Sequence, residues 1–488
     1  KIMKFIYKIL FTVCFVGLMG CGESFEEINQ DPNNPTSVPT SFILSSAQRD
    51  LVREFLGVDT DAPHANWAMQ YVQYWSSTLY TETSRYQDIK DDWAEVYFDG
   101  LNDLEEIIRI NSDEELKSDA AQYGSNNNQI AIAKILQVWG FHNVTDIWGD
   151  IPFSQALKGS DGFSPVYDRQ EDVYHGLIDM LEEAATLISE GGAGPDGDLI
   201  FSGDMEKWRL FANSLKLRMG MRISKVDPTT AEMWVSEAVA DGVISDTDEN
   251  VYFPYLLSSP NYNPWYFEVY VDGGTFTLAC TNTFIDALNA YNDPRLPQFA
   301  APSQQDGVFL GIPFGVESGV ASQYDNREVS FQSPEVYDSP GRIMTYSEVL
   351  LLQAEAAQRG WISGDPETLY EAGILANMEE WGLNLADVDT DAYLNQASVS
   401  YDPANFEELI GNQLWFALYL QPLESWAQWR RLGYPDLQPA PAAIQNRDIP
   451  RRRGYPADEA TLNRINYEAA VAIQGPDLLE TRIWWDAE

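Results

Sequence analysis

Positive charge is scarce in this sequence of 488 residues. It contains 30 Lys and Arg against 75 Asp and Glu, so the formal net charge at pH 7 is −45. Proteins bind nucleic acids largely by neutralising phosphates with Lys and Arg, and anionic membrane surfaces attract basic segments in the same way. The composition therefore excludes nucleic acid as a partner and disfavours direct binding to an anionic membrane surface.

Histidine and the common catalytic motifs are also rare or missing. The three histidines are far apart in the sequence, at His64, His142 and His175. There is no His-Glu-x-x-His pair, no Gly-x-Ser-x-Gly nucleophile elbow and no Walker loop. Paired carboxylates can hydrolyse glycosides, but 75 acidic residues make chance pairs certain. The residues therefore single out no catalytic pair, no metal site and no cofactor site.

Two segments match known motifs only by their letters. Residues 192–197 read as a dinucleotide fingerprint, but they follow a predicted helix rather than a strand, so we interpret them as a loop. The segment from Asp246 to Asn250 begins like a calcium-binding loop, but Val251 replaces the required Gly and Leu257 replaces the bidentate Glu. A lone structural calcium remains the alternative at this position.

The N-terminal residues resemble the secretory signal of a lipoprotein. Residues 1–8 are basic and residues 9–20 are apolar, which is shorter than the roughly 20 residues that span a bilayer. The apolar run ends in Leu18-Met-Gly-Cys21, which resembles the lipobox of bacterial lipoproteins. We expect residues 1–20 to be the signal peptide and Cys21 to carry the lipid.

Residues 21–40 are predicted to be a flexible, lipid-anchored tether, because they are rich in Asn, Pro, Ser and Thr. The acidic residues after Cys21 resemble the export signal that sends Bacteroidetes lipoproteins to the cell surface. Cys14 would leave with the signal, so Cys280 would be the remaining thiol and no intramolecular disulfide could form. We expect an outer-membrane, surface-exposed, lipid-anchored protein.

The remainder, residues 41–488, is predicted to be a single, mostly α-helical domain. Apolar residues recur at helical spacing in eleven segments, at 41–56, 64–79, 92–110, 128–142, 171–189, 204–223, 229–240, 280–291, 345–359, 367–381 and 405–419. Their pairing indicates tetratricopeptide-like units. Strand signals are few and short, at 269–271 and 275–277, and long irregular stretches cover 244–279 and 292–341. Loops of that length usually carry function.

Arginines cluster near the C-terminus of this acidic chain, at Arg430, Arg431, Arg447, Arg451, Arg452 and Arg453. Arg suits bidentate pairing with carboxylates, so we interpret the cluster as a set of internal ion pairs. Contact with a partner protein or an anionic ligand is the alternative.

An ordered set of segments resembles the SusD/RagB family, particularly its SusD-like branch. The resemblance spans roughly residues 21–488 and rests on Ile28-Asn-Gln-Asp-Pro-Asn-Asn-Pro35, Asp146-Ile-Trp-Gly-Asp-Ile-Pro-Phe-Ser-Gln-Ala-Leu157, Asn292-Asp-Pro-Arg-Leu296, the helix from Met344 to Ala356, Trp429-Arg-Arg-Leu-Gly-Tyr-Pro435, Arg453-Gly-Tyr-Pro456 with Asn463 and Asn466, and Thr481-Arg-Ile-Trp-Trp-Asp486. No single segment is decisive, but their order is specific.

The resemblance implies a helical body with a loop-built binding face and no catalytic residues. Such proteins cap a SusC-like TonB-dependent transporter in the outer membrane, capture an oligosaccharide and deliver it to the barrel. A peptide-binding RagB-like lipoprotein is the first alternative, and a surface glycosidase is the second.

Two aromatic segments without clean helical burial are the candidate ligand site. One runs from Tyr74 to Tyr86 and the other from Tyr255 to Tyr270. Tyr and Trp combine an apolar face with a polar tip, which suits sugar binding. The predicted stacking rings are Trp75, Tyr80, Tyr262, Trp265 and Tyr266, with Arg85 and Asn263 as polar partners. The alternative is that these rings pack the loops onto helices.

We predict that Cys21→Ala leaves the protein soluble or mislocalised, because the acylated thiol would be missing. Palmitate labelling and membrane fractionation measure the effect, with Cys280→Ala as the control that keeps the lipobox intact. A Cys21→Ala protein that still labels and still fractionates with the outer membrane would contradict the lipoprotein interpretation.

Overall fold

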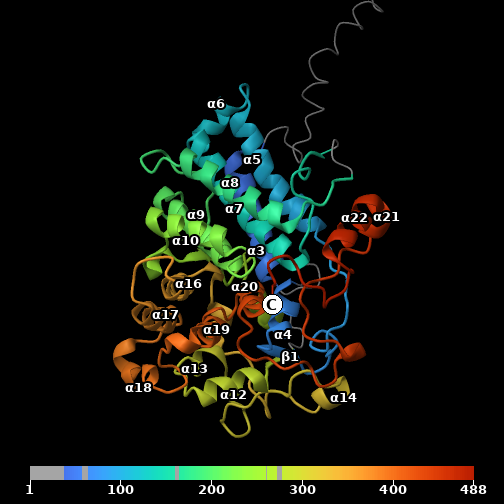
Figure 1. Ribbon diagram of the computed structural model, residues 1–488, viewed down its shortest axis with the longest axis vertical. Helices are drawn as coiled ribbons and strands as arrows, with labels where there is room; N and C mark the ends of the chain where they lie inside the picture. Colours follow the sequence, from blue (N-terminus) through green and yellow to red (C-terminus); the bar gives the residue numbers. More distant parts are fainter. Residues whose placement is uncertain (1–37, 58–63, 160–163, 260, 272–276, 488) are drawn as a thin grey trace, which may run out of the picture.

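A computed structural model describes residues 38–57, 64–159, 164–259, 261–271 and 277–487 (Figure 1). The predicted signal peptide, Cys21 and the tether up to residue 37 lie outside the described residues. The model confirms the mostly α-helical fold with few, short strands.

Consecutive helices pack as antiparallel pairs, and the pairs stack on one another through the upper and left-hand parts of Figure 1. This arrangement is the tetratricopeptide-like repeat that the sequence predicts, in which each pair buries its apolar face against the next. The main helices are α3 (Thr40–Leu56), α5 (Asn102–Ser112), α7 (Asn126–Trp148), α8 (Gln170–Leu187), α9 (Met205–Arg222), α10 (Pro228–Asp241), α16 (Tyr346–Gln358), α17 (Pro366–Glu380), α19 (Phe406–Ala417) and α20 (Pro422–Leu432).

Local capping sets where several of these helices begin. The side chains of Asp204, Asp227, Thr345 and Asp365 accept hydrogen bonds from backbone N–H groups in the first turns of α9, α10, α16 and α17. A Pro also occupies the first position of α10 and α17, where its missing N–H costs nothing. These boundaries therefore follow directly from the sequence.

Shorter elements connect the pairs and build the lower end of the molecule. The helices among them are α4 (His64–Tyr71), α6 (Lys117–Ala120), α11 (Pro264–Tyr266), α12 (Asn282–Ala290), α13 (Leu296–Phe299), α14 (Ser318–Ala321), α15 (Pro334–Asp338), α18 (Thr390–Leu394), α21 (Glu459–Leu462) and α22 (Arg464–Gln474), with π-helices η1 (Val96–Leu101) and η5 (Phe267–Val271). The remaining single turns are η2 (Ala121–Tyr123), η4 (Thr247–Glu249), η6 (Leu385–Asp387), η7 (Pro403–Asn405) and η8 (Ile444–Asn446).

Two predicted elements differ from the structure. The helix expected over 64–79 ends at Tyr71, because Gln73 adopts a positive φ of 60° and the chain then enters a strand. The prediction of a strand at 269–271 is wrong. These residues form the end of η5, because the side chain of Asn263 caps a helix at Pro264 that continues directly into it. Of the strand expected at 275–277, residues 275 and 276 lie outside the described residues.

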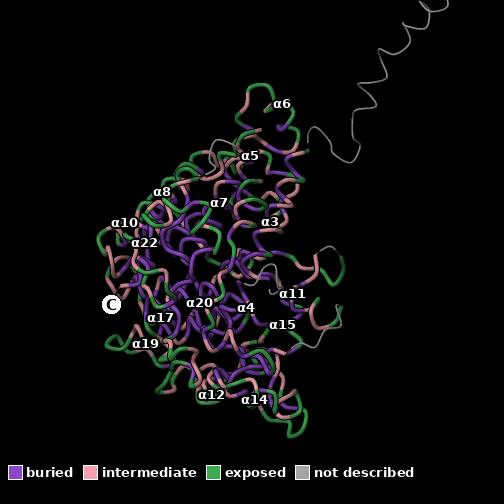
Figure 2. Tube along the Cα trace, turned by 90° about the vertical axis from the view of Figure 1, so that its right-hand side faces the viewer, coloured by how far each residue is buried: buried purple, intermediate pink, exposed green. Residues whose placement is uncertain are grey.

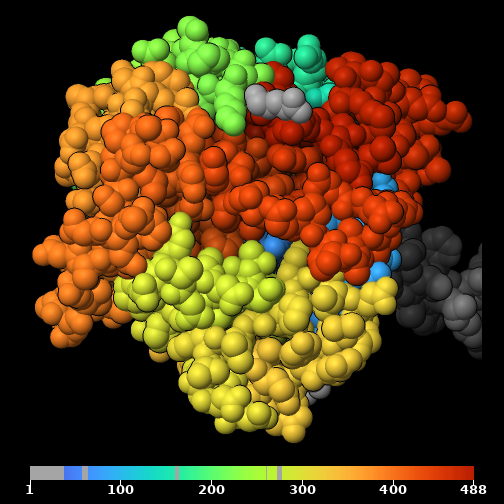
Figure 3. Space-filling view, turned by 60° about the horizontal axis from the view of Figure 1, so that its bottom comes forward, coloured from blue at the N-terminus to red at the C-terminus, as the bar shows by residue number. Residues whose placement is uncertain are grey.

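Two small antiparallel sheets tie the irregular stretches to the helical body. Strand β1 (Trp75–Ser77) pairs with β3 (Leu278–Cys280), so that Trp75 lies opposite Cys280. Strand β2 (Val251–Phe253) pairs with β4 (Gly341–Met344). Beyond these strands, residues 280–340 form a lobe that projects from the orange and red helical body (Figure 3). We call the surface built by the described residues between 254 and 341, which includes this lobe, the loop-built face.

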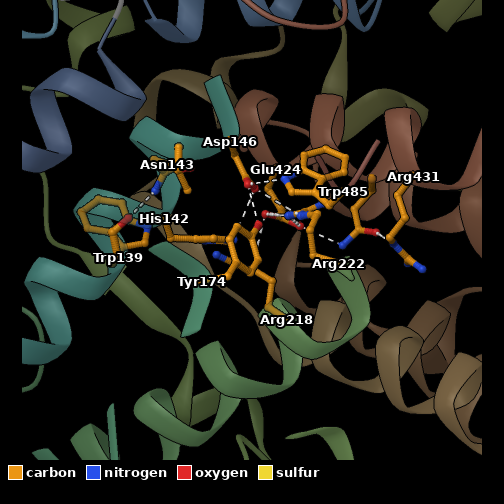
Figure 4. Close-up of polar contacts among 12 residues, drawn as sticks. Trp139, His142, Asn143, Asp146, Tyr174, Arg218, Arg222, Glu424, Arg431 and Trp485 are labelled. Atoms are coloured by element: carbon orange, nitrogen blue, oxygen red, sulfur yellow. Dashed lines mark hydrogen bonds and ion pairs between the residues drawn. The ribbon is translucent and has the colours of Figure 1, made fainter. Parts of the chain in front are cut away.

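A buried network of arginines and carboxylates joins the helix pairs (Figure 4). On α7, one Asp146 oxygen accepts hydrogen bonds from Tyr174 of α8 at 2.5 Å and from Trp485 at 2.7 Å. The other lies 3.2 Å from Nε of Arg222 on α9. Arg222 in turn donates to Glu424 of α20 at 2.6 Å. One chain of contacts thus crosses four helices and the C-terminal segment.

A second arginine of α9 extends the network to α16. Arg218 forms a bidentate pair with Glu348, with both N–O distances 2.7 Å. Burial alone would raise the pKa of Glu424, but Arg222 and Arg218 outweigh burial and lower that pKa to about 2. Glu424 therefore keeps its charge inside the core at neutral pH, whereas burial outweighs Arg218 at Glu348 and raises the pKa of that carboxyl to about 7.

The C-terminal arginine cluster forms internal ion pairs, as the sequence interpretation expects. Five of its members have carboxylate partners, in the pairs Arg431–Glu355, Arg447–Glu480, Arg451–Asp486, Arg452–Asp477 and Arg453–Asp91. Arg430 instead lies over the Trp426 ring at 3.6 Å and donates to the Asp146 carbonyl at 2.8 Å. Burial lowers the pKa of Arg430 to about 9.

Buried histidines should make stability depend on pH. Burial lowers the pKa of His142 to about 4, and that of His64 likewise. In the unfolded chain the histidines have a pKa of about 6.5, so they take up protons below that pH, whereas the buried histidines of the folded protein do not. The free energy of unfolding therefore decreases as pH falls from 6.5 toward 4. Each histidine should contribute a loss of about 2 kcal/mol between pH 7 and pH 5.

Between pH 7 and pH 5, we predict that the unfolding free energy of His142→Gln falls by about 2 kcal/mol less than that of wild type. Urea denaturation at both pH values measures it. His175→Gln is the matched control, because His175 is exposed. Equal pH dependence in wild type and His142→Gln would show that this ring is protonated in the folded protein.

Candidate ligand-binding face

Asn263 positions the aromatic segment of the loop-built face. Its side-chain oxygen accepts hydrogen bonds from the backbone N–H groups of Trp265 at 2.9 Å and Tyr266 at 3.1 Å, which starts α11. Its side-chain nitrogen donates to the Ser339 carbonyl at 2.8 Å. One buried amide thus both begins the helix and holds it against the segment that follows α15. Figure 2 shows α11 and α15 near each other at one edge of the molecule.

Three tyrosines follow one another at a spacing of four residues, with Tyr262 just before α11, Tyr266 at its end and Tyr270 in η5. The ring centroids of Tyr262 and Tyr266 are 6.2 Å apart and nearly parallel, and those of Tyr266 and Tyr270 are 5.1 Å apart. Tyr270 then meets Tyr337 of α15 edge to face at 5.4 Å. We call Tyr262, Tyr266, Tyr270 and Tyr337 the tyrosine ladder. Tyr270, with 58 % of its surface exposed, is its most open member.

The ladder leads into a groove of about 530 Å³. The groove lies between the residue after β1, the end of η5 and the irregular stretch around α15. Its lining is mainly apolar, with a few amides and one carboxylate, and comprises Thr78, Val269, Tyr270, Ala301, Pro302, Gln304, Asp325, Asn326, Val329, Phe331, Gln332, Pro334 and Tyr337. Apolar walls with a few polar groups are typical of small-ligand sites.

Two amides in this lining are available to a ligand. The exposed side chains of Gln304 and Asn326 make no hydrogen bond within the described part of the chain. The Gln332 amide is less available to a ligand, because its nitrogen already donates to the Leu278 carbonyl at 3.1 Å. An amide can donate and accept at once, so the groove can match hydroxyl or acetamido groups.

The structure divides the predicted site residues. Trp75 is fully buried and Trp265 is 4 % exposed, and their rings meet edge to face at 4.6 Å. The indole nitrogen of Trp75 donates to the Tyr419 hydroxyl at 2.9 Å. These two rings, like Asn263, therefore lie beneath the surface of the loop-built face, and in this conformation neither ring has a face open to a ligand.

The other predicted residues lie nearer the surface. Tyr80, after β1, is 72 % exposed, and Tyr262 and Tyr266 are half-buried in the ladder. Arg85 is half-buried, and its Nε donates to the Ala442 carbonyl at 2.8 Å. These four residues thus comprise two ladder members, one exposed ring and one guanidinium that already donates a hydrogen bond to the backbone.

Sequence reasoning missed half of the ladder and the amides of the groove. Tyr270 had a usable signal, because its spacing of four from Tyr266 places both rings on one side of a helix. Tyr337, Gln304 and Asn326 had none, since they follow Tyr270 by more than 30 residues of irregular chain. Their position depends on the packing of α15 and the preceding loop.

Neither a metal centre nor a membrane-spanning helix is found in the part of the chain that is described. Across residues 38–487, gaps aside, no three His, Cys, Asp or Glu side chains are placed to hold a metal ion. Likewise, no helix within these ranges is both long and apolar enough to cross a membrane. The segment that begins like a calcium loop forms η4 instead, with Asp246 and Glu249 capping it reciprocally.

Comparisons with known proteins agree on one family. The family model described as starch-binding associating with outer membrane, SusD-like, matches residues 32–456. A solved chitin-binding protein shares 28 % identity, with a TM-score of 0.79 over 92 % of this chain and all of that one. A SusD homologue from Bacteroides uniformis shares 25 % identity, with a TM-score of 0.77 over 92 % of this chain and all of that one.

A chitin-binding SusD homologue from Flavobacterium johnsoniae has the same fold. It shares 23 % identity, with a TM-score of 0.77 over 91 % of this chain and 99 % of that one. A comparison with curated protein sequences gives no match. Stacked helix pairs with a grooved, aromatic, loop-built face define a helical-repeat binding protein. The chain belongs to the SusD-like family, which is described as starch-binding and associated with the outer membrane.

Replacing two of the predicted site rings should change the stability by very different amounts. Trp75→Ala should lower the unfolding free energy by about 3–5 kcal/mol, because it removes a fully buried ring. Tyr80→Ala should change it by less than about 0.5 kcal/mol, because that ring is exposed. Urea denaturation measures both. A Trp75→Ala protein as stable as wild type would show that this ring is not part of the core and can face a ligand.

Proposed function

We propose that this protein is a lipid-anchored, cell-surface glycan-binding protein that delivers oligosaccharide to a SusC-like TonB-dependent transporter. The observation that carries the binding role is the tyrosine ladder, which leads to a groove with two uncommitted amides. Membership of a starch-binding, outer-membrane-associated family supports the same role. The sequence of residues 1–21 supports the lipid anchor, with Cys21 as its site.

Ring stacking supplies the physical basis of the binding. The apolar faces of sugar rings lie well against aromatic rings, while amides bind the hydroxyl groups at the edges. Tyr270 offers such a ring at the groove, with the buried ring of Tyr337 packed against it, and Gln304 and Asn326 offer the amides. A related structure, 28 % identical, is a chitin-binding protein. Chitin oligosaccharides are therefore the first ligands to test.

The groove lining favours binding without hydrolysis. Glycosidases place two carboxyl groups on either side of the bond they cleave. Among the described residues that line the groove, Asp325 is the single carboxylate. We therefore propose that the protein is not an enzyme and that bound glycan leaves the groove unchanged. An extended peptide is the alternative ligand that binding measurements must address.

We predict that Tyr270→Ala weakens binding of chitohexaose by roughly tenfold, on the order of 1–2 kcal/mol. Tyr270→Phe should keep most of the affinity, because it retains the ring. Phe98→Ala is the matched control, since it removes an exposed aromatic ring from η1, outside the groove. Isothermal titration calorimetry measures all four proteins after their melting curves have been compared.

Two outcomes would count against the proposal. Equal affinity of wild type and Tyr270→Ala for every glycan that binds would exclude the groove as the site. Binding of peptides but of no glycan would favour the peptide-binding alternative. Release of shorter sugars from a bound polymer, followed by chromatography, would show that the protein is an enzyme.

A further inference from the structure

The loop-built face has very little positive charge of its own. Residues 254–341 contain ten acidic residues, two arginines and no lysine. One of the arginines, Arg295, is fully buried and pairs with Asp293 at 2.6 Å. It also donates to Asn377 at 2.8 Å, so it is committed to the core. This leaves Arg327 as the cation of this segment that reaches the surface.

Arg327 is held by acidic neighbours at the edge of the groove. It directly follows Asp325 and Asn326, which line the groove. The Asp325 carboxylate accepts hydrogen bonds from the Arg327 backbone N–H at 2.8 Å, from Nε at 3.0 Å and from Nη2 at 2.8 Å. Glu328 adds a second carboxylate at 3.8 Å from Nη2. The guanidinium is therefore neutralised twice.

The turn that carries this pair is fixed to the opposite side of the loop. The backbone N–H of Gln304 donates to the Asn326 carbonyl at 3.0 Å, and that of Gln305 donates to the Arg327 carbonyl at 3.0 Å. The hydrogen bonds from Arg327 hold the pKa of Asp325 well below its usual range. Asp325 therefore stays negatively charged at neutral pH, in the lining of the groove.

We propose that the groove selects uncharged glycans and rejects glycans that carry carboxylate or sulfate groups, with Asp325 as the specificity-determining residue. This inference rests on the proposed function. Asp325 and Glu328 together hold two carboxylates against the single guanidinium of Arg327, so the cluster remains negatively charged. An anionic sugar placed in the groove would meet this excess negative charge and would find the guanidinium already paired. Discrimination of this kind arises from repulsion of the wrong ligand as much as from attraction of the right one. The net charge of −45 adds a long-range barrier that acts on any anion.

The first experiment separates the two proposals. Wild type and Tyr270→Ala are incubated with neutral polymers (chitin, starch and mixed-linkage β-glucan) and acidic polymers (alginate, polygalacturonate and chondroitin sulfate) in pull-down assays. We expect at least one neutral polymer, and no acidic polymer, to retain the wild-type protein. Retention by an acidic polymer that is lost in Tyr270→Ala would overturn the charge selection but support glycan binding in the groove. Retention by no polymer would overturn the proposed function and this inference together.

The second experiment tests Asp325 itself. Affinities for chitohexaose and its 6-O-sulfated derivative are compared in wild type, Asp325→Asn and Asp306→Asn. The two variants remove the same charge from neighbouring loops, but Asp306 does not line the groove. We expect Asp325→Asn to reduce the discrimination between the two sugars at least fivefold and Asp306→Asn to leave it nearly unchanged. An equal reduction in both variants, or none in Asp325→Asn, would overturn the role of Asp325.

Discussion

The buried pairing of arginine with carboxylate is the constraint on which the rest of this structure depends. Asp146, Arg222 and Glu424 come from three helices that are far apart in the sequence, and each satisfies the charge of another inside the core. Removal of one partner of such a buried pair typically costs about 3–5 kcal/mol, because the other charge is left without compensation. Any other stacking of these helix pairs would leave the charges buried without partners, which favours the observed arrangement.

The helical body could be predicted from the sequence because its signals are local. The caps at Asp204 and Asp365 and the helical spacing of apolar residues depend only on neighbouring positions. The strand predicted at 269–271 was wrong, although the signal that decides it is also local. Val269 and its neighbours favour a strand by composition, yet they continue a helix that the Asn263 side chain starts 6 residues earlier. The arginine cluster was interpretable, because an acidic chain offers many carboxylates, but the identity of each partner was not.

The candidate site illustrates the same limit. Aromatic residues in irregular segments pointed to the region around the groove, but composition cannot distinguish a ring that faces solvent from one that lies beneath it. Trp75 and Trp265 support the face from below, whereas Tyr270 and Tyr337 form part of the groove. The difference arises from the pairing of β1 with β3, which turns Trp75 toward Tyr419. The spacing of four residues between the tyrosines was the one local clue to their common orientation.

The double role of the Asn263 amide has a consequence for how such a protein can diversify. Its bonds to the start of α11 and to the Ser339 carbonyl hold the backbone under the ladder without using any ladder side chain. The exposed rings and amides can therefore be exchanged one at a time while the scaffold beneath them keeps its shape. A lineage could in this way change the ligand it recognises through a few surface substitutions, each nearly neutral for folding.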